Sequence, residues 1–357
     1  MSHTDVGPVS EGISIDELRL AARNHGMPLE ALRYDLTPVG LHYLLIHFDI
    51  PETESADWSV ELGGRVGDPR PILLDEIVAS PAVTVPVTME CAGNGRALLE
   101  PRPISQPWLD EAVGTAAWTG TPLRPFLERA GVGPDAVEVV FAGADHGTQG
   151  DVEQDYERSL PLDEAMRDDV LLAWAMNGQP LPPQHGFPLR LLVPGWYGMA
   201  SVKWLRRIEL VSSPFDGFQQ EAYRLRDDDD DPGTAVTRIQ PRALMVPPGD
   251  PDFLTRERFA DAGAIRLRGR AWSGYGPIAR VEVSSDDGAT WSDAALEPAP
   301  APYAWVGWTF DWDAPAGRHR LRARATDETG ATQPDDPPWN AGGFSNTTPQ
   351  VVDVTVG

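Results

Sequence analysis

The sequence predicts an α+β domain followed by an immunoglobulin-like β-sandwich, and three observations support this fold class. Between Tyr43 and about Ile208, short apolar strand-like runs alternate with helical pieces without strict strand–helix order, which favours α+β over a doubly wound sheet. Beyond residue 234, short strands with tight turns are typical of a sandwich. The acidic run Asp227–Asp231, followed by Pro232 and Gly233, indicates a solvated linker between the two.

These boundaries divide the 357 residues into three parts. We expect an N-terminal helical extension at 1–37, a first domain at 38–230 and a second domain at 235–357. In the extension, residues 11–36 have an amphipathic helical pattern that Pro38 ends. In the first domain, strands are predicted at 43–48, 58–62, 83–89, 137–141 and 189–193, and helices at 122–130 and 162–177.

The second domain has two clear strand patterns. Residues 279–284 alternate, and Asp287-Gly288 is a hairpin signal before the pattern resumes at Trp291. At 318–325, arginines alternate with mostly apolar residues, so that one side of the strand is basic. We expect this arginine row to be a solvated or interface face.

The composition limits the partners and the compartment. A net charge of -25 argues against a nucleic-acid partner or an anionic membrane surface, because both require a basic face. An anionic substrate is still compatible with a local cationic pocket. No apolar run approaches the roughly 18 residues that span a bilayer, and the first residues lack a leader pattern. We therefore expect a cytoplasmic protein.

Cys91 is the only cysteine, and it lies in the run Cys91-Ala-Gly-Asn-Gly-Arg96. One thiol excludes a disulfide framework, a four-thiolate iron-sulfur cluster, a CxxCH haem attachment and a cysteine-rich zinc site. A buried inert thiol, a nucleophile and a single soft metal ligand remain. Gly93 and Gly95 favour a close backbone approach to another group, and we expect Arg96 to favour the thiolate.

Several other segments of the first domain carry residues suited to a polyanionic ligand. Lys203 is the only lysine in the chain, which suggests a position that requires a compact ammonium. No GxxxxGK[ST], GxGxxG or HExxH pattern occurs, so nucleotide and zinc-protease functions lack support. The segments that could grip an anion are His47, Arg96, Asp145–Gly147, His185–Arg190 and Ser201–Trp204.

Taken in order, these segments resemble the molybdenum sulfite oxidases and their relatives. Cys91–Arg96 is similar to that family's Cys-Ala-Gly-Asn-x-Arg loop, and Ala112–Leu123 resembles the segment that follows it. The similarity extends from about Pro38 to the C-terminus. The other matching stretches are Met176–Arg190, Pro194-Gly195 and Val202–Trp204, with Gln333-Pro334, Trp339-Asn340 and Gly342–Phe344 resembling the end of the family's dimerisation domain.

The resemblance implies one molybdenum-molybdopterin cofactor per chain, with Cys91 as the protein ligand to molybdenum, and a homodimer. Tyr156 matches an active-site tyrosine whose hydroxyl can donate to a substrate oxygen. Arg96 and Trp108 match residues of the substrate pocket. The residues that would bind molybdopterin and its phosphate are His47, Cys91, Asp145, His185, Arg190, Ser201, Val202 and Lys203.

Two departures from the family pattern concern the substrate. Leu45 stands where sulfite oxidases usually have an arginine, and Ile46 replaces the asparagine that follows it. Near 303–308, where the family's second domain lends an arginine to the pocket, the sequence has none. Each missing guanidinium removes charge and orientation for a doubly charged anion.

The sequence therefore predicts a molybdenum-dependent oxidoreductase that oxidises sulfite to sulfate by oxygen-atom transfer. Since the chain carries no haem or iron-sulfur motif, the electrons would leave to an external acceptor. One alternative is reduction of a neutral S-oxide or N-oxide, which suits Leu45. Another is a non-catalytic scaffold relative. Nitrate reduction is disfavoured, because the flavin and haem modules of nitrate reductases are absent.

Overall fold

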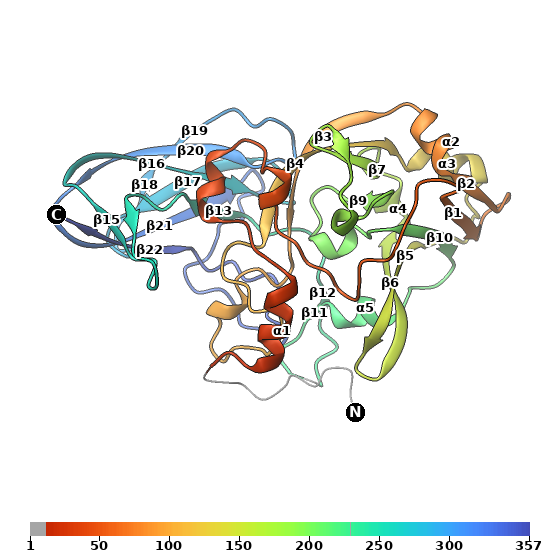
Figure 1. Ribbon diagram of the computed structural model, residues 1–357, viewed down its shortest axis with the longest axis horizontal. Helices are drawn as coiled ribbons and strands as arrows, with labels where there is room; N and C mark the ends of the chain where they lie inside the picture. Colours follow the sequence, from red (N-terminus) through yellow and green to blue (C-terminus); the bar gives the residue numbers. More distant parts are fainter. Residues whose placement is uncertain (1–11, 229) are drawn as a thin grey trace.

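The computed structural model describes residues 12–228 and 230–357. In the first half of the chain, which contains β1 to β10, two sheets share one apolar core (Figure 1). One sheet has the strand order β2-β1-β10-β5-β6, and the other has the order β3-β4-β7-β8 with β9 paired to β7. These strands are β1 (Ser59–Gly64), β2 (Arg70–Leu73), β3 (Val83–Glu90), β4 (Val113–Pro122), β5 (Glu138–Gln149), β6 (Val152–Pro161), β7 (Leu171–Met176), β8 (Gln179–Pro180), β9 (Arg190–Leu192) and β10 (Leu205–Val211).

The helices of this half are few and short. They connect the strands or cover the ends of the sheets, so that the fold is mostly β. They are α2 (Leu74–Ala79), α3 (Arg124–Ala130), α4 (Leu162–Ala165) and α5 (Phe218–Ala222), with the 3-10 helices η3 (Arg96–Leu98), η4 (Pro183–His185) and η5 (Gly198–Ala200).

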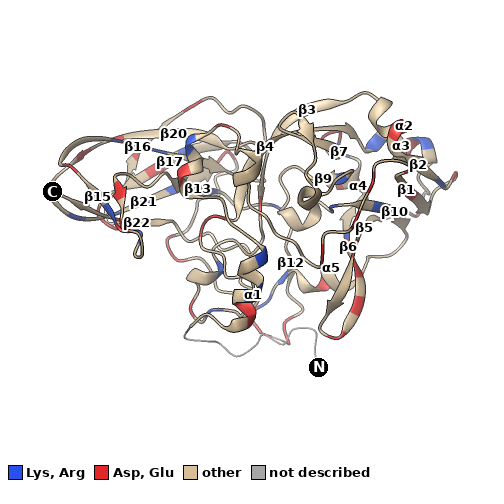
Figure 2. Cartoon of the chain, viewed as in Figure 1, with Lys and Arg blue, Asp and Glu red and all other residues tan. Residues whose placement is uncertain are grey.

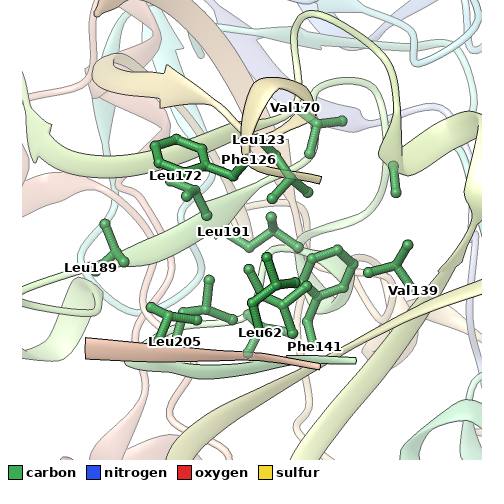
Figure 3. Packing of buried hydrophobic residues seen from close by; sticks show 14 of the residues in the cluster. Leu62, Leu123, Phe126, Val139, Phe141, Val170, Leu172, Leu189, Leu191 and Leu205 are labelled. Atoms are coloured by element: carbon green, nitrogen blue, oxygen red, sulfur yellow. The ribbon is translucent and has the colours of Figure 1, made fainter. Parts of the chain in front are cut away.

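The core of the first half lies between the two sheets (Figure 3). Leu172 and Leu191 contribute from one sheet, and Leu62 and Phe141 from the other; all four side chains are buried. In the sheet that carries Leu62 and Phe141, β1 runs parallel to β10 and pairs Leu62 with Ile208. The neighbouring pairs β1–β2 and β10–β5 are antiparallel. Packing of apolar side chains between two layers therefore fixes the strands that carry the site.

Two further sheets form the second half around a separate core. The strand orders are β13-β16-β20-β19 and β14-β15-β22-β21-β17-β18. The strands are β13 (Arg242–Met245), β14 (Asp250–Pro251), β15 (Arg258–Ala260), β16 (Gly263–Trp272), β17 (Ile278–Ser284), β18 (Ser292–Asp293), β19 (Ala295–Leu296), β20 (Val306–Ala314), β21 (Gly317–Asp327) and β22 (Val351–Val356), and the short ribbon β11 (Arg224–Leu225) with β12 (Thr234–Ala235) precedes them.

The strand patterns predicted in this half are confirmed. Leu321, Ala323 and Ala325 of β21 are buried in the core, whereas the arginines between them form ion pairs on the other face. The β17–β18 hairpin contains the Asp287-Gly288 turn, where both residues have positive φ. Alternation placed the side chains of β21 correctly because this strand has one buried and one more exposed face, whereas residues 281–284 of β17 are buried on both faces.

The N-terminal segment lies against both halves. Its helices are α1 (Ile15–Arg23), η1 (Leu29–Arg33) and η2 (Val39–Leu41). The Leu32 carbonyl accepts a hydrogen bond from Arg270 Nε at 2.9 Å, and the Asp35 carbonyl accepts one from Trp305 Nε1 at 2.7 Å. Both donors belong to the second half, while the same segment continues into the first (Figure 1).

Three element predictions were wrong. The helix predicted at 11–36 is shorter, and its Ile15 and Leu18 are 64% and 51% exposed, because Glu17 is the side chain that α1 buries, in an ion pair with Arg102. The strand predicted at 43–48 is also absent: among these described residues, Leu44 forms an isolated β-bridge with His25. Residue 11 and the rest of 1–11 lie outside the described residues.

The third error is the helix predicted at 162–177. It ends after one turn at Ala165, and Leu171–Met176 forms β7 between β4 and β9. A continuous apolar run is typical of a strand buried on both faces as well as of a buried helix. Among the described helices, none is long and apolar enough to cross a membrane.

We expect Leu191→Ala to lower the free energy of unfolding by about 2–5 kcal/mol, because the side chain is fully buried between the sheets and the change leaves a cavity. The matched control is Leu73→Ala, whose side chain is 55% exposed and should change stability by less than about 0.5 kcal/mol. Urea unfolding followed by tryptophan fluorescence measures both. Equal losses in the two variants would contradict this assignment of the core.

Candidate functional site

A cavity opens in the first half beside the loop that follows β3. This inner cavity, of about 70 Å³, adjoins a wider outer pocket of about 440 Å³. Leu45, His47, Cys91 and Tyr223 line both spaces. Cys91 therefore borders the inner cavity and the outer pocket.

Most of the site residues predicted from the sequence line the inner cavity. Arg96 and Trp108 instead line the outer pocket, while Val202 is buried in the apolar core and lines neither space. The predicted residues in the inner wall are His47, Cys91, Asp145, Tyr156, His185, Arg190, Ser201 and Lys203.

Strand ends and one bulge bring these side chains together. Cys91 directly follows β3, Arg190 begins β9, and Lys203 lies just before β10. In β5 the register against β6 shifts between Ala142 and His146, and this irregularity contains Asp145. Bulges commonly redirect a side chain toward a site, as the one here does for Asp145.

Two cations are held at the inner wall by backbone carbonyls. Arg190 donates to the His185 carbonyl at 3.1 Å and to the Ser201 carbonyl at 2.8 Å. Lys203 Nζ donates to the carbonyls of Leu45 at 2.8 Å and Gln184 at 3.2 Å. Carbonyls satisfy hydrogen bonds but carry no net charge, so the wall still favours an anion.

Burial shifts the pKa of each of these wall residues toward its neutral form. Burial lowers the pKa of Lys203 to about 7 and that of Arg190 to about 10. Burial also lowers the pKa of His42 to about 4 and that of His185 to about 2. Burial raises the pKa of Asp145 to about 7, even though Lys203 is nearby. A bound phosphate would stabilise the charged forms of the cations.

His42 is buried beside the inner wall. Its Nε2 has no hydrogen-bond partner among the described residues, and its ring lies edge-on to His185 with 5.5 Å between ring centroids. This nitrogen packs against Gly114 of β4, where an added Cβ would lie 2.8 Å from it, so the strand needs a small residue at 114.

The Cys91 thiol is only 8% exposed. Burial raises the pKa of the thiol, and Arg96 acts in the opposite direction without overcoming burial. Arg96 thus favours the thiolate, as expected from the sequence, but burial outweighs it. A bound metal cation would deprotonate the thiol by coordination.

The Arg96 guanidinium forms part of the outer pocket. Nε donates to the Gly342 carbonyl at 3.0 Å and Nη1 to the Gln106 carbonyl at 3.2 Å, while the guanidinium lies over the Phe344 ring, 5.1 Å from its centroid. A Cβ added to Gly93 would be 2.6 Å from the guanidinium carbon. Glycine at 93 is what lets the arginine lie across the loop.

Two tyrosines reach the site in different ways. The Tyr156 hydroxyl lies in the inner wall and donates to the Met199 carbonyl at 2.9 Å. Tyr223, which follows α5, lies at the junction of the two spaces, where the charges of Cys91 and Arg96 act on its hydroxyl. The sequence reasoning missed Tyr223.

Other wall residues were also missed. No motif marks them, although a histidine inside the apolar run 41–45 is a signal that could have found His42. Gln219 Nε2 contacts both His47 Nε2 at 3.1 Å and Gln149 Oε1 at 3.0 Å, and these three residues form one side of the outer pocket.

The cations at the mouth of the outer pocket come from an unexpected segment. Arg224 and Arg226 line this pocket, and so does Asp228 of the acidic run. The predicted linker therefore reaches the site. Asp229 of the same run lies outside the described residues. Acidic positions are spread over both halves of the chain (Figure 2), whereas Arg190 and Lys203 line the inner wall.

Comparison with known families decides the assignment. Residues 47–219 match the oxidoreductase molybdopterin binding domain, and residues 235–356 match the Mo-co oxidoreductase dimerisation domain. The chain belongs to the sulfite oxidase family of molybdopterin-binding oxidoreductases. The family cofactor is molybdenum carried by molybdopterin, and the second match supports a homodimer.

Individual relatives within this family differ in activity. The chain is 32% identical over 90% of its length to the NADH nitrate reductase of Solanum lycopersicum, and 31% identical over 92% to NADH nitrate reductase 1 of Arabidopsis thaliana. It spans only 39% and 40% of those two proteins. The sulfane dehydrogenase SoxCD from Paracoccus pantotrophus is similar in structure, with a TM-score of 0.80 at 26% identity, covering 97% of this chain and 91% of that one.

The wall residues fit the family cofactor. The carbonyl-bound cations suit a phosphate at the inner end, while Cys91 offers a soft ligand in the wall that the two spaces share. These features are observed in the chain itself and do not depend on the family match.

The low pKa of His185 predicts a pH dependence of stability. The folded state keeps His185 neutral, whereas the unfolded chain takes up a proton near the ordinary pKa of 6.5. The contribution of His185 to stability is therefore complete above about pH 6.5 and is lost as the pH falls toward the folded pKa.

For protein prepared without cofactor, we expect His185→Asn to make the loss of stability between pH 6.5 and 4.5 shallower by up to about 1.4 kcal/mol per pH unit. Urea unfolding at several pH values measures the slope. An unchanged slope would contradict burial of a neutral His185.

Proposed function

We propose that this oxidoreductase oxidises sulfite to sulfate by oxygen-atom transfer and passes two electrons to an external acceptor. The observation that supports this most is the position of Arg96 and Tyr223 beside Cys91. A buried guanidinium and a hydroxyl donor next to a metal ligand suit a small sulfur oxyanion.

In this proposal the inner cavity binds the cofactor. Arg190 and Lys203 hold the phosphate of molybdopterin, and His47, Asp145, His185 and Ser201 complete the wall. Cys91 is the protein ligand to molybdenum. When bound, the cofactor supplies oxygen-atom transfer and takes up the two electrons. Val202 contributes by packing beneath Ser201 and Lys203, because its side chain is buried in the core.

The outer pocket binds the substrate. Arg96 attracts and orients the anion, with Trp108 as an apolar wall that limits access of water. Tyr223 donates a hydrogen bond to a substrate oxygen, and burial raises the pKa of Tyr223 to about 12, so the hydroxyl stays protonated near neutral pH. Tyr156 supports the inner wall through Met199. Arg224 and Arg226 in the wall of the outer pocket supply positive charge, which is missing at Leu45, the position where sulfite oxidases usually have an arginine.

One observation favours a second candidate, reduction of a neutral S-oxide or N-oxide. Leu45 borders both spaces, and the neutral amides of Gln149 and Gln219 line the outer pocket. Neutral groups at these positions suit a neutral substrate, whereas cations there would favour an anion. Turnover of a sulfoxide with a reduced viologen dye, without turnover of sulfite, would select this candidate.

The wider assignments are also proposals. We propose domain boundaries at 38–230 and 235–357, an immunoglobulin-like topology for the second domain and a homodimer formed through it. We also propose that the protein is located in the cytoplasm. Light scattering of the purified protein tests the dimer, and cell fractionation tests the compartment.

The metal assignment predicts different defects in two variants. Lys203→Ala should lower molybdenum content, because it removes a cation from the phosphate site. Cys91→Ser should lower sulfite oxidation with ferricyanide by about 10²-fold or more, because a hydroxyl is a poor substitute for a soft thiolate. Elemental analysis and the ferricyanide assay measure the two effects, with Arg19→Ala, 74% exposed, as control. Metal-loaded wild type that never turns over sulfite would refute the substrate and leave the cofactor assignment intact.

The two tyrosines should behave differently. Tyr223→Phe removes a donor at the junction and should lower kcat/KM for sulfite by about 10²-fold. Tyr156→Phe removes a hydrogen bond to a carbonyl and should lower it by less than about tenfold. Steady-state kinetics of the two variants, normalised to molybdenum, measure the contrast. A larger loss in Tyr156→Phe would assign the donor role to Tyr156, as the sequence predicted.

A further inference from the structure

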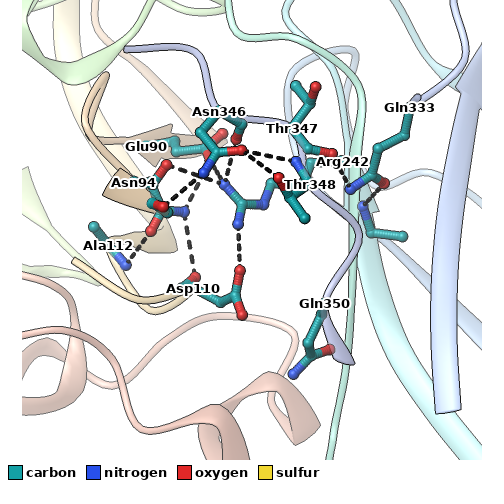
Figure 4. A network of polar contacts seen from close by, with 12 residues as sticks. Glu90, Asn94, Asp110, Ala112, Arg242, Gln333, Asn346, Thr347, Thr348 and Gln350 are labelled. Carbon is teal, nitrogen blue, oxygen red and sulfur yellow. Dashed lines mark hydrogen bonds and ion pairs between the residues drawn. The ribbon is translucent and has the colours of Figure 1, made fainter. Parts of the chain in front are cut away.

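The second half of the chain grips the loop that carries Cys91, and Arg242 of β13 is at the centre of this contact. Its side chain is 1% exposed and forms ion pairs with two carboxylates of the first half. Nη1 is 3.2 Å from Glu90 Oε1, and Nη2 pairs with Asp110 (Figure 4). One guanidinium thus joins the end of β3 to the segment that precedes β4.

Glu90 directly precedes Cys91, and each of its oxygens is held. Oε1 accepts from Asn94 Nδ2 at 2.9 Å in addition to Arg242, and Oε2 accepts from Trp272 Nε1 at 2.8 Å. Trp272 belongs to β16 of the second half. The residue beside the thiol therefore has little freedom to rotate.

The other end of the loop is held in the same way. Asn346 Nδ2 donates to the Gly95 carbonyl at 2.6 Å, and the Ser345 amide donates to the Ala92 carbonyl at 2.8 Å. The Asn346 carbonyl in turn accepts from Arg242 Nη1 at 3.0 Å. Gly95 has φ of 85°, and a Cβ there would lie 2.8 Å from Asn346 Nδ2. The close approach requires glycine.

A buried ion cluster of this kind favours one geometry more than it favours stability. Apolar residues of similar volume can replace buried ion pairs with little loss, but removal of one partner leaves buried charge without compensation. Without Arg242, the carboxylates of Glu90 and Asp110 would both lie unpaired beside the loop, and the loop would have to open to hydrate them.

We propose that Arg242 is a positioning residue that sets the place of the Cys91 sulfur, so that the second half shapes a metal site whose inner cavity it does not line. This inference rests on the proposed role of Cys91 as the metal ligand. It acts through Glu90 and Asn346 and requires no contact between Arg242 and the cofactor.

The first test uses the full chain produced without cofactor. Since Cys91 is the only cysteine, all alkylation by iodoacetamide reports access to this thiol, and the stability-matched control separates local opening of the loop from global unfolding. Arg242→Met should raise that rate by about tenfold or more under native conditions. The matched control is Arg258→Met, because Arg258 is 5% exposed and pairs with Glu30 at 2.9 Å instead of with Glu90 or Asp110. That control should lose stability but keep the wild-type rate.

Two further variants separate position from stability. Glu90→Gln, Asp110→Asn and Arg242→Met combined remove every charge of the cluster, so this triple variant should regain melting temperature. It still lacks the guanidinium that joins Glu90, Asp110 and the Asn346 carbonyl, so it should label faster than wild type. Arg242→Lys keeps the charge and loses the forked geometry, and it should label at an intermediate rate. If Arg242→Met does not fold, these two variants decide the question.

The second test uses the loaded protein. The Mo(V) electron paramagnetic resonance signal after partial reduction reports the position of the sulfur, and it should differ from wild type in the Arg242 variants and not in Arg258→Met. Wild-type labelling together with a wild-type signal in a folded Arg242 variant would overturn the proposal. Sulfite turnover is not measured, so failure of the substrate assignment remains a separate result.

Discussion

Positive charge buried beside a cavity is the constraint on which the site depends. Arg190 and Lys203 have their hydrogen bonds satisfied by carbonyls, yet carbonyls cannot neutralise a full charge. The start of β9, the segment before β10 and the bulge in β5 all meet at this wall. The strands thus hold the cations in place before an anion arrives, and a ligand that binds only the folded state adds to its stability.

The metal ligand stands under a different constraint from the phosphate wall. The wall is built within the first half, whereas the Cys91 loop is held between two halves that have separate cores. The anion site can therefore form from one set of strands, but the geometry of the thiol depends on how the halves pack.

The sequence predicted much of this site because its residues lie in short continuous motifs. The Cys91–Arg96 loop and the residues around His185 and Lys203 were found in this way, as were strands with one buried face. Leu171–Met176 was read as a helix because a strand buried on both faces has no alternation. Tyr223 was missed because it lies in no motif and reaches Cys91 only through packing of α5. The rise in the pKa of the Cys91 thiol could not be predicted either, because it is caused by burial, and burial is a property of the fold.

The N-terminal segment has a consequence for how the protein unfolds. Because Leu32 and Asp35 supply acceptors to Arg270 and Trp305 while the chain continues into the first half, this segment behaves as a strap across the boundary. The halves therefore cannot hinge apart without breaking these two hydrogen bonds, although each half has its own core.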